Sequence, residues 1–246
     1  MFVGGRRISG SDDRRSIRAW DVGAGRCEGV LEGHAAWVTS LAASVSGSRL
    51  LSGSDDRTVR VWGMEGEASS WPCERTLDGH GHSVSCSAAW GDRVACGFVD
   101  GVIRVWSLET WGLERTLRGH EKCVEAQVVS GGRLISSSFD LMVRVWSVET
   151  WGCVQKVEAY PAGSDQCIRA LAVCGSALVG GSVGGSRSVE REVRVWDLET
   201  LRPLHTLRQP AGADVESLVW NGREVWGAVG SQFVVWGRRG RTGCVS

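Results

Sequence analysis

Hydrophobic and polar residues alternate in short runs along most of the chain. Clear examples are VTSLAAS at 38–44, RLLSGS at 49–54 and TVRVW at 58–62, with Gly, Asp and Ser filling the gaps between such runs. A period of two, interrupted every few residues by turn formers, is typical of half-buried β-strands. No stretch sustains the 3.6-residue period of a helix. The pattern therefore predicts an all-β protein.

A tryptophan ends one of these runs about every 42 residues. The sequence VRVW or a close variant ends at Trp20, Trp62, Trp106, Trp146, Trp196 and Trp236, with spacings of 42, 44, 40, 50 and 40 residues. Leu-x-Gly-His keeps step with it at 31–34, 77–80 and 117–120. Each repeat has room for about four short strands, a sheet too small to bury both faces alone, and radial stacking of such sheets gives a β-propeller. We expect about six blades of four-stranded antiparallel sheets in a single domain over 1–246.

The repeat also carries residues that point to a known family. The Gly-His marker, an Asp six residues before the tryptophan and the Trp-Asp pair at Trp20–Asp21 and Trp196–Asp197 resemble the WD-repeat family. The stretches WSLETWG, WSVETWG and WDLETL are most similar to the WD-repeat domains appended to kinases and ubiquitin-ligase adaptors. The resemblance covers nearly the whole chain and implies a WD-repeat β-propeller.

The resemblance further implies a hydrogen-bonded chain of His, Ser or Thr, Asp and Trp inside each blade. The matching positions are His34, Ser52, Asp56 and Trp62 in the second repeat, His80, Asp100 and Trp106 in the third, and His120, Ser136, Asp140 and Trp146 in the fourth. In the third repeat Cys96 replaces the hydroxyl, and the fifth is expected to lack the His. A catalytic triad occurs once in a domain, whereas these residues recur once per repeat. We therefore interpret them as structural and expect no enzyme activity.

Composition and motifs argue against several other classes of function. The chain has 28 basic and 28 acidic residues, whereas nucleic-acid-binding domains usually carry a basic excess. It shows no phosphate loop or dinucleotide fingerprint, and its five histidines do not form a metal-binding set. We expect no cofactor, no metal, no nucleic acid and no small-molecule substrate.

The nine cysteines are odd in number and contain no C-x-x-C pair. The N-terminal residues have no apolar core of a signal peptide, and no run of about 18 apolar residues predicts a membrane span. We expect no membrane association and a cytoplasmic location, with the nucleus as the alternative. In such a reducing compartment, we expect the cysteines to be small packing residues, including Cys27, Cys73 and Cys153, which share one repeat position.

Partner-binding residues are expected on the loops, because loops vary while the scaffold stays fixed. On the face of the d–a and b–c loops the candidates are Trp37, His82, Phe139, Tyr160, Arg169 and Glu216. Aromatic residues and arginine are frequent binding anchors, and Phe139 is the first choice among these candidates. On the opposite face Trp111 and Trp151 occupy the same place in successive ETWG turns. They either form a second contact patch or fold back onto their own strands.

The terminal repeats are expected to be incomplete, with three strands each near 6–10, 16–20 and 27–31 and near 214–220, 223–228 and 232–236. The chain is then either a six-bladed ring or a portion of a larger protein, and a seventh blade stays open. The function predicted is a non-catalytic scaffold or substrate-recruiting module that binds other proteins. The alternatives are a regulatory WD-repeat portion of a larger enzyme, such as a kinase or ubiquitin ligase, and an RNA-binding propeller.

Overall fold

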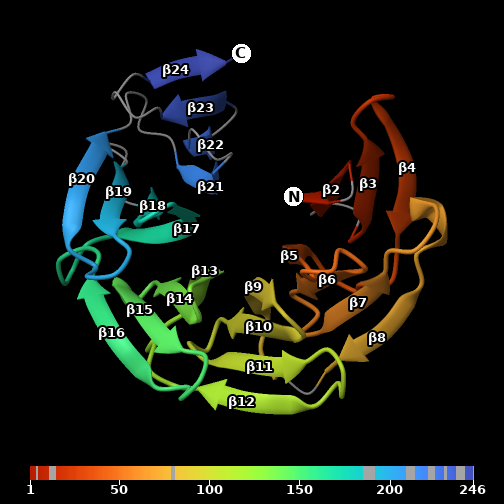
Figure 1. The fold of residues 1–246 in the computed structure, drawn as a ribbon, viewed down its shortest axis with the longest axis horizontal. Coiled ribbons are helices and arrows are strands. Elements are labelled where there is room, and N and C mark those ends of the chain that lie inside the picture. Colours follow the sequence, from red (N-terminus) through yellow and green to blue (C-terminus); the bar gives the residue numbers. More distant parts are fainter. Residues whose placement is uncertain are drawn as a thin grey trace. The chain divides into compact units, whose positions relative to one another are not determined.

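The computed structural model describes residues 1–3, 5–10, 15–78, 81–184, 192–208, 214–220, 225–229, 232–236 and 242–245. Over these residues the protein is all-β, with six four-stranded antiparallel sheets built from consecutive strands and one short 3-10 helix (Figure 1). We number the sheets 1 to 6 along the chain. The all-β class and the six blade-like sheets confirm the prediction. Two compact units, Met1–Val124 and Glu125–Ser246, divide the chain, and a single domain over 1–246 stays a prediction.

The first unit contains sheets 1 to 3 and the 3-10 helix. Sheet 1 consists of β1 (Phe2–Val3), β2 (Arg6–Gly10), β3 (Ile17–Asp21) and β4 (Arg26–Leu31). Sheet 2 consists of β5 (Val38–Ala43), β6 (Arg49–Ser54), β7 (Val59–Gly63) and β8 (Cys73–Leu77), with η1 (Ala68–Ser70) between its last two strands. Sheet 3 consists of β9 (Val84–Trp90), β10 (Arg93–Phe98), β11 (Ile103–Ser107) and β12 (Leu113–Leu117).

The second unit contains the strands of sheets 4 to 6. Sheet 4 consists of β13 (Val124–Ser130), β14 (Arg133–Ser138), β15 (Met142–Ser147) and β16 (Cys153–Glu158). Sheet 5 consists of β17 (Gln166–Cys174), β18 (Ala177–Gly184), β19 (Glu192–Asp197) and β20 (Pro203–Arg208). Sheet 6 consists of β21 (Val215–Trp220), β22 (Val225–Val229), β23 (Gln232–Trp236) and β24 (Thr242–Val245).

Within each unit, consecutive sheets pack face to face. In the first unit Ile8 and Ile17 of sheet 1 share a buried cluster with Leu50 and Trp62 of sheet 2. The first strands of sheets 2 and 3, β5 and β9, lie side by side (Figure 1). At this contact a Cβ at Gly53 would overlap Val84, so the close approach of the two sheets requires a glycine. The alternating valines of the VRVW strands supply this core.

The repeated tryptophan stands at a β-bulge. In sheets 1 to 5 the pairing of the third and fourth strands shifts register between the tryptophan and the residue before it. A bulge bends its strand and re-aims a side chain. The shift comes near the end of the VRVW run in each of these sheets.

The structure corrects two expectations about the terminal sheets and the cysteines. Sheets 1 and 6 each have four strands. Phe2–Val3 forms the first strand of sheet 1 and Thr242–Val245 the last strand of sheet 6, and the sequence pattern predicted neither. The prediction of incomplete terminal blades was therefore wrong in strand number, although β1 pairs through only two residues. Cys86, Cys96 and Cys167 are buried as expected, but Cys27, Cys73 and Cys153 are exposed.

Candidate functional site

Sheet 2 contains a continuous chain of buried polar side chains. The indole Nε1–H of Trp62 donates to Ser52 Oγ at 2.9 Å, and Ser52 Oγ lies 2.7 Å from His34 Nε2. His34 Nδ1 lies 2.7 Å from Asp56 Oδ2. A neutral imidazole satisfies every contact if Nδ1–H donates to Asp56 and Nε2 accepts from the Ser52 hydroxyl. Asp56 also accepts the backbone N–H of Ala35 at 2.9 Å, so the chain links two strands, β6 and β7, and two loops.

Burial and hydrogen bonding set the charges of this chain. Burial lowers the pKa of His34, more than the Asp56 carboxylate raises it, which keeps the imidazole neutral. For Asp56 burial acts to raise the pKa, but the hydrogen bonds from Thr58, Ala35 and His34 together outweigh it and bring the value to about 2. The result is an ionised carboxylate beside a neutral imidazole, with no exposed serine hydroxyl beside a free base. This is the geometry of a buried structural hydrogen-bond network.

Related tryptophan–serine contacts recur in other sheets. Trp20 Nε1–H donates to Ser9 Oγ at 3.0 Å in sheet 1, and Trp146 Nε1–H donates to Ser136 Oγ at 2.9 Å in sheet 4. His120 is buried, and Asp140 accepts the backbone N–H of Met142 at 3.0 Å. The Ser9 contact escaped sequence reasoning because the first repeat has no Gly-His marker.

Sheet 3 departs from the pattern at Cys96. His80 lies outside the described residues. Asp100 accepts the backbone N–H of Val102 at 3.1 Å, and burial raises the pKa of Cys96, so the thiol stays neutral where sheet 2 has a serine. Trp106 is buried and meets Phe98 edge to face at a ring separation of 6.2 Å.

The face of the first unit that carries the d–a and b–c loops presents an exposed indole. Trp37, just before β5, is 57% exposed, and Val99, just after β10, is 44% exposed. Backbone hydrogen bonds hold both in place, from Asp55 N–H to Trp37 O at 3.0 Å and from Val99 N–H to Ser83 O at 3.2 Å. His82 lies at the same loop level, exposed and 3.8 Å from the Asp100 carboxylate. We call Trp37, His82 and Val99 the loop-face patch.

Comparisons with known proteins identify the repeat. The family model of the WD domain, G-beta repeat, matches residues 25–63, 71–107 and 111–147. These three matches cover the outer strands of sheets 1 to 3 and the first three strands of sheets 2 to 4, each match ending with a VRVW-type run. The chain contains WD repeats.

Individual relatives are similar over parts of this WD-repeat chain. Nuclear distribution protein PAC1-2 of Uncinocarpus reesii is 39% identical over 88 residues, 36% of this chain and 18% of the relative. Nuclear distribution protein PAC1 of Yarrowia lipolytica is 37% identical over 108 residues, 40% of this chain and 23% of the relative. A CCR4-associated factor 4 homolog of Candida glabrata is 35% identical over 99 residues, 37% of this chain and 17% of the relative. The chain thus spans about a fifth of the length of these relatives.

The fifth WD repeat replaces the histidine by Tyr160. Residues 157–160, VEAY, occupy the place of LEGH at 31–34, and Tyr160 is only 3% exposed. The Arg194 guanidinium lies 4.0 Å from the ring centroid. Its Nε–H and Nη2–H both donate to Glu192 Oε2, at 3.0 and 2.9 Å. Tyr160 therefore belongs to the core of sheet 5 and does not offer its ring to a partner. Aligning VEAY with LEGH was the signal that could have found it.

The other loop candidates of the second unit differ in accessibility. Phe139 is 43% exposed just before Asp140, as expected for a contact residue. Arg169 is exposed and lies 3.8 Å from the nearly buried Glu125 carboxylate, so part of its charge is already engaged. Glu216 lies in β21, and its side chain is outside the described residues. Phe139 and Arg169 are thus both exposed, and Arg169 is partly engaged by an ion pair.

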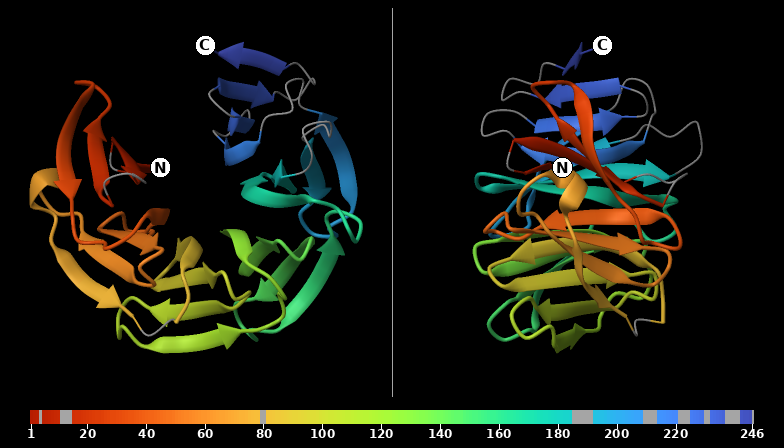
Figure 2. Two further views of the ribbon diagram at one scale, coloured as in Figure 1. Left: turned by 180° about the vertical axis from the view of Figure 1, so that it is seen from behind. Right: turned by 90° about the vertical axis from the view of Figure 1, so that its right-hand side faces the viewer.

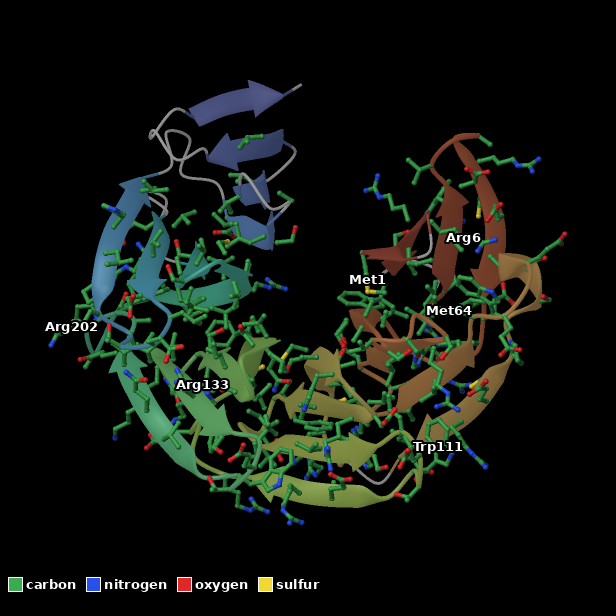
Figure 3. The ribbon with its side chains drawn as sticks, in the orientation of Figure 1. Met1, Arg6, Met64, Trp111, Arg133 and Arg202 are labelled. Atoms are coloured by element: carbon green, nitrogen blue, oxygen red, sulfur yellow. The ribbon has the colours of Figure 1, made fainter. Side chains whose placement is uncertain are left out.

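In the first ETWG turn, Trp111 follows neither of the two predicted alternatives. Trp111, at φ 61°, packs against the cluster between sheets 2 and 3, with the guanidinium carbons of Arg49 and Arg75 at 4.9 and 5.8 Å from its ring (Figure 3). Arg49 also pairs with Glu74 at 3.0 Å and donates to Leu108 O at 3.2 Å. The indole thus reaches back to the preceding sheet rather than to its own strand. Trp151 has the same φ of 61° and is half-buried.

Trp71 repeats this arrangement one sheet earlier. It follows η1, which packs beside β4 (Figure 2), and its ring lies 5.7 Å from the Arg6 guanidinium. Gly29 of β4 is required there, because a Cβ would overlap the backbone of Ala68. Trp71 and Trp111 therefore join neighbouring sheets and leave little ring surface for a partner.

Two absences apply to the described part of the chain. No helix in it is long and apolar enough to cross a membrane. Within the same residues, no group of three or more His, Cys, Asp and Glu side chains is placed to hold a metal ion.

Proposed function

We propose that this WD-repeat protein is a non-catalytic platform that binds another protein through the loop-face patch of its first unit. The observation that carries the proposal is Trp37, a large indole more than half exposed on a backbone held by hydrogen bonds. Tryptophan is enriched among the residues that dominate binding energy at protein interfaces. Its rigid support means that little ordering entropy is lost on binding.

The composition of the patch favours a partner with an apolar anchor and a basic group. Trp37 and Val99 offer apolar surface. Asp55, whose backbone N–H donates to Trp37 O, has an exposed carboxylate that makes no ion pair among the described residues. A basic side chain of the partner would complement that carboxylate. Phe139 of the second unit is a further candidate anchor.

The absence of catalysis is part of the proposal. The His34–Ser52–Asp56 set, which resembles a triad in composition, is buried and its hydroxyl is shared with Trp62. A nucleophilic serine must be reachable by substrate. The names of the relatives, nuclear distribution protein and CCR4-associated factor, describe those proteins and support a role in assembly rather than chemistry here.

Affinity capture with quantitative mass spectrometry tests the proposal. The tagged chain and its Trp37→Ala variant are compared with Val45→Ala, because Val45 is 74% exposed at the opposite end of β5. We expect a set of proteins that is captured by the wild type and Val45→Ala and lost, by about tenfold or more, with Trp37→Ala, since a buried anchor contributes at least about 1.4 kcal/mol. Equal capture by all three would contradict the proposal.

A further inference from the structure

Three cysteines occupy one structural position in three sheets. Cys27, Cys73 and Cys153 each pair with the repeated tryptophan at the β-bulge, as Trp20–Cys27, Trp62–Cys73 and Trp146–Cys153. Each thiol donates to the carbonyl oxygen two residues further along, at 3.4, 3.4 and 3.5 Å. All three are exposed. The backbone thus presents three matched thiols to solvent.

An arginine distinguishes two of these thiols from the third. Arg60 Nη1 donates to Cys73 Sγ at 3.7 Å, and Arg144 Nη1 donates to Cys153 Sγ at 3.9 Å. At Cys27 the equivalent Arg18 instead lies over the ring of Trp20, 5.9 Å from its centroid. Cys27 is therefore an internal control, with the same backbone and exposure but a different neighbour.

The two guanidinium groups are not neutralised. Neither Arg60 nor Arg144 forms an ion pair with a carboxylate among the described residues, and the Nε of each is buried without a hydrogen-bond partner. Elsewhere, in contrast, Arg6, Arg49 and Arg93 pair with glutamates at 2.6, 3.0 and 2.7 Å. Each site therefore combines an exposed thiol with an unpaired cation, which attracts anions.

Three other described cysteines, Cys96, Cys167 and Cys174, are poor competitors for a thiol reagent. Burial raises the pKa of Cys167 to about 12 and that of Cys174 to about 11, and it also raises the pKa of the fully buried Cys96. A neutral, inaccessible thiol reacts slowly, because the thiolate is the nucleophile and must reach the reagent. Burial thus slows the reaction of these three cysteines, and the neighbouring arginine distinguishes among the exposed ones.

We propose that Cys73 and Cys153 are sites of mixed-disulfide formation with a small anionic disulfide of the glutathione class. The cysteine loses its proton to solvent, and its sulfur attacks one sulfur of the disulfide. A new S–S bond joins the cysteine to one half of the reagent, and the other half leaves as a thiolate. The neighbouring guanidinium attracts the anionic disulfide and pairs with a carboxylate of the attached half.

Site-resolved mass spectrometry of the folded chain in glutathione disulfide tests the proposal. We expect Cys73 and Cys153 to be modified about fivefold faster than Cys27, the factor that one unit charge about 4 Å away contributes in water. The excess should shrink as salt is added. Equal rates at the three cysteines, or a faster Cys27, would overturn the proposal.

A crossed pair of variants separates the arginine from general exposure. Arg144→Gln should slow Cys153 and leave Cys73 unchanged, and Arg60→Gln should do the reverse, with circular dichroism showing that each variant is folded. Because Arg60 also packs against Gly33, Arg144→Gln is the decisive variant if Arg60→Gln unfolds. Replacing glutathione disulfide by uncharged bis(2-hydroxyethyl) disulfide should reduce the preference over Cys27. An unchanged rate at Cys153 in Arg144→Gln would reject the role of the arginine.

Discussion

Sheets 2 and 5 fill the same internal position with different chemistry. In sheet 2 His34 joins Ser52 and Asp56 in a hydrogen-bonded chain, whereas in sheet 5 Tyr160 lies under the Arg194 guanidinium at 4.0 Å. Ser52 pairs with Arg60 across the sheet, and the matching partner of Arg194 is Gly180. Gly180 leaves room for the Trp196 ring, which would lie 2.9 Å from an added Cβ. In both sheets an arginine covers a buried side chain at this position. The side chain is a histidine in a hydrogen-bonded network in sheet 2 and a tyrosine ring in sheet 5.

The covering arginine explains a further difference between the two sheets. At Gly33, φ is 147°, and a Cβ would lie 2.8 Å from Arg60 Nη1, so the Gly of the Gly-His marker makes room for the guanidinium. Sheet 5 has Ala159 at this place, and its carbonyl oxygen accepts a hydrogen bond from Arg194. Sheet 5 therefore lacks both residues of the Gly-His marker, and its arginine contacts the two residues that stand in their place.

Removing the histidine should have the largest effect. His34→Ala leaves the Asp56 carboxylate and the Ser52 hydroxyl without their buried partner and opens a cavity, so we expect a loss of about 3 kcal/mol in the free energy of unfolding. Urea unfolding measures it. The control is His82→Ala, an exposed histidine whose removal should cost less than about 0.5 kcal/mol. Similar losses in the two variants would contradict the assigned role of His34.

Adding a side chain at Gly180 tests the aromatic solution in sheet 5. Gly180→Ala would place a Cβ 2.9 Å from Trp196 and 3.0 Å from Ile168, and we expect a destabilisation of about 2 kcal/mol from overpacking. Gly152→Ala is the matched control, because its nearest neighbour would be the Thr150 hydroxyl at 3.6 Å. A neutral Gly180→Ala would show that sheet 5 is loosely packed.

The two sheets should respond to opposite ends of the pH range. Burial lowers the pKa of His34 from 6.5, so below about pH 6.5 the unfolded chain binds a proton that the folded chain resists, and sheet 2 loses stability. The contribution of Asp56 is lost lower, as pH falls from about 4 toward 2. Burial raises the pKa of Tyr160 above 10, so sheet 5 loses stability as pH rises past 10. Hydrogen exchange resolved by peptide would separate the two responses, and parallel loss in both sheets would contradict this account.

The smallest effect is expected for the Tyr160 hydroxyl. That hydroxyl is buried and has no hydrogen-bond partner among the described residues, while the nearby Ser182 Oγ already accepts the Glu192 N–H at 2.8 Å. Tyr160→Phe keeps the ring under Arg194 and removes the unpaired group, so the melting temperature should stay the same or rise slightly. A marked fall would mean that the hydroxyl has a partner.

Sequence periodicity predicted most of the fold because period-two alternation and turn residues are local signals. The strands of sheets 2 to 5 fall where the VRVW runs and their neighbours indicated. The first strand of sheet 1 and the last of sheet 6 escaped, because Phe2–Val3 is too short to alternate and Thr242–Val245 lies in a glycine-rich basic tail. Such strands are defined by pairing with their sheet, which no local pattern records.

The candidate site was predictable only where one residue type carries one role. His34, Ser52, Asp56 and Trp62 could be placed through the resemblance to the WD-repeat family, whereas Tyr160 was assigned to the surface because a tyrosine at a histidine position carries no motif. The exposure of Cys73 and the position of the Trp111 ring depend on the bulge and on the preceding sheet. These are tertiary contacts, and they decide which side chains are available to partners.

The most direct test of the account is hydrogen exchange of the chain with and without a partner obtained by capture. The account predicts protection at residues 35–38, 81–84 and 98–101, around Trp37, His82 and Val99, with residues 64–72 and 108–112 of the opposite turns unchanged. Protection confined to those opposite turns, around Trp71 and Trp111, would contradict the claim that the loop-face patch binds the partner.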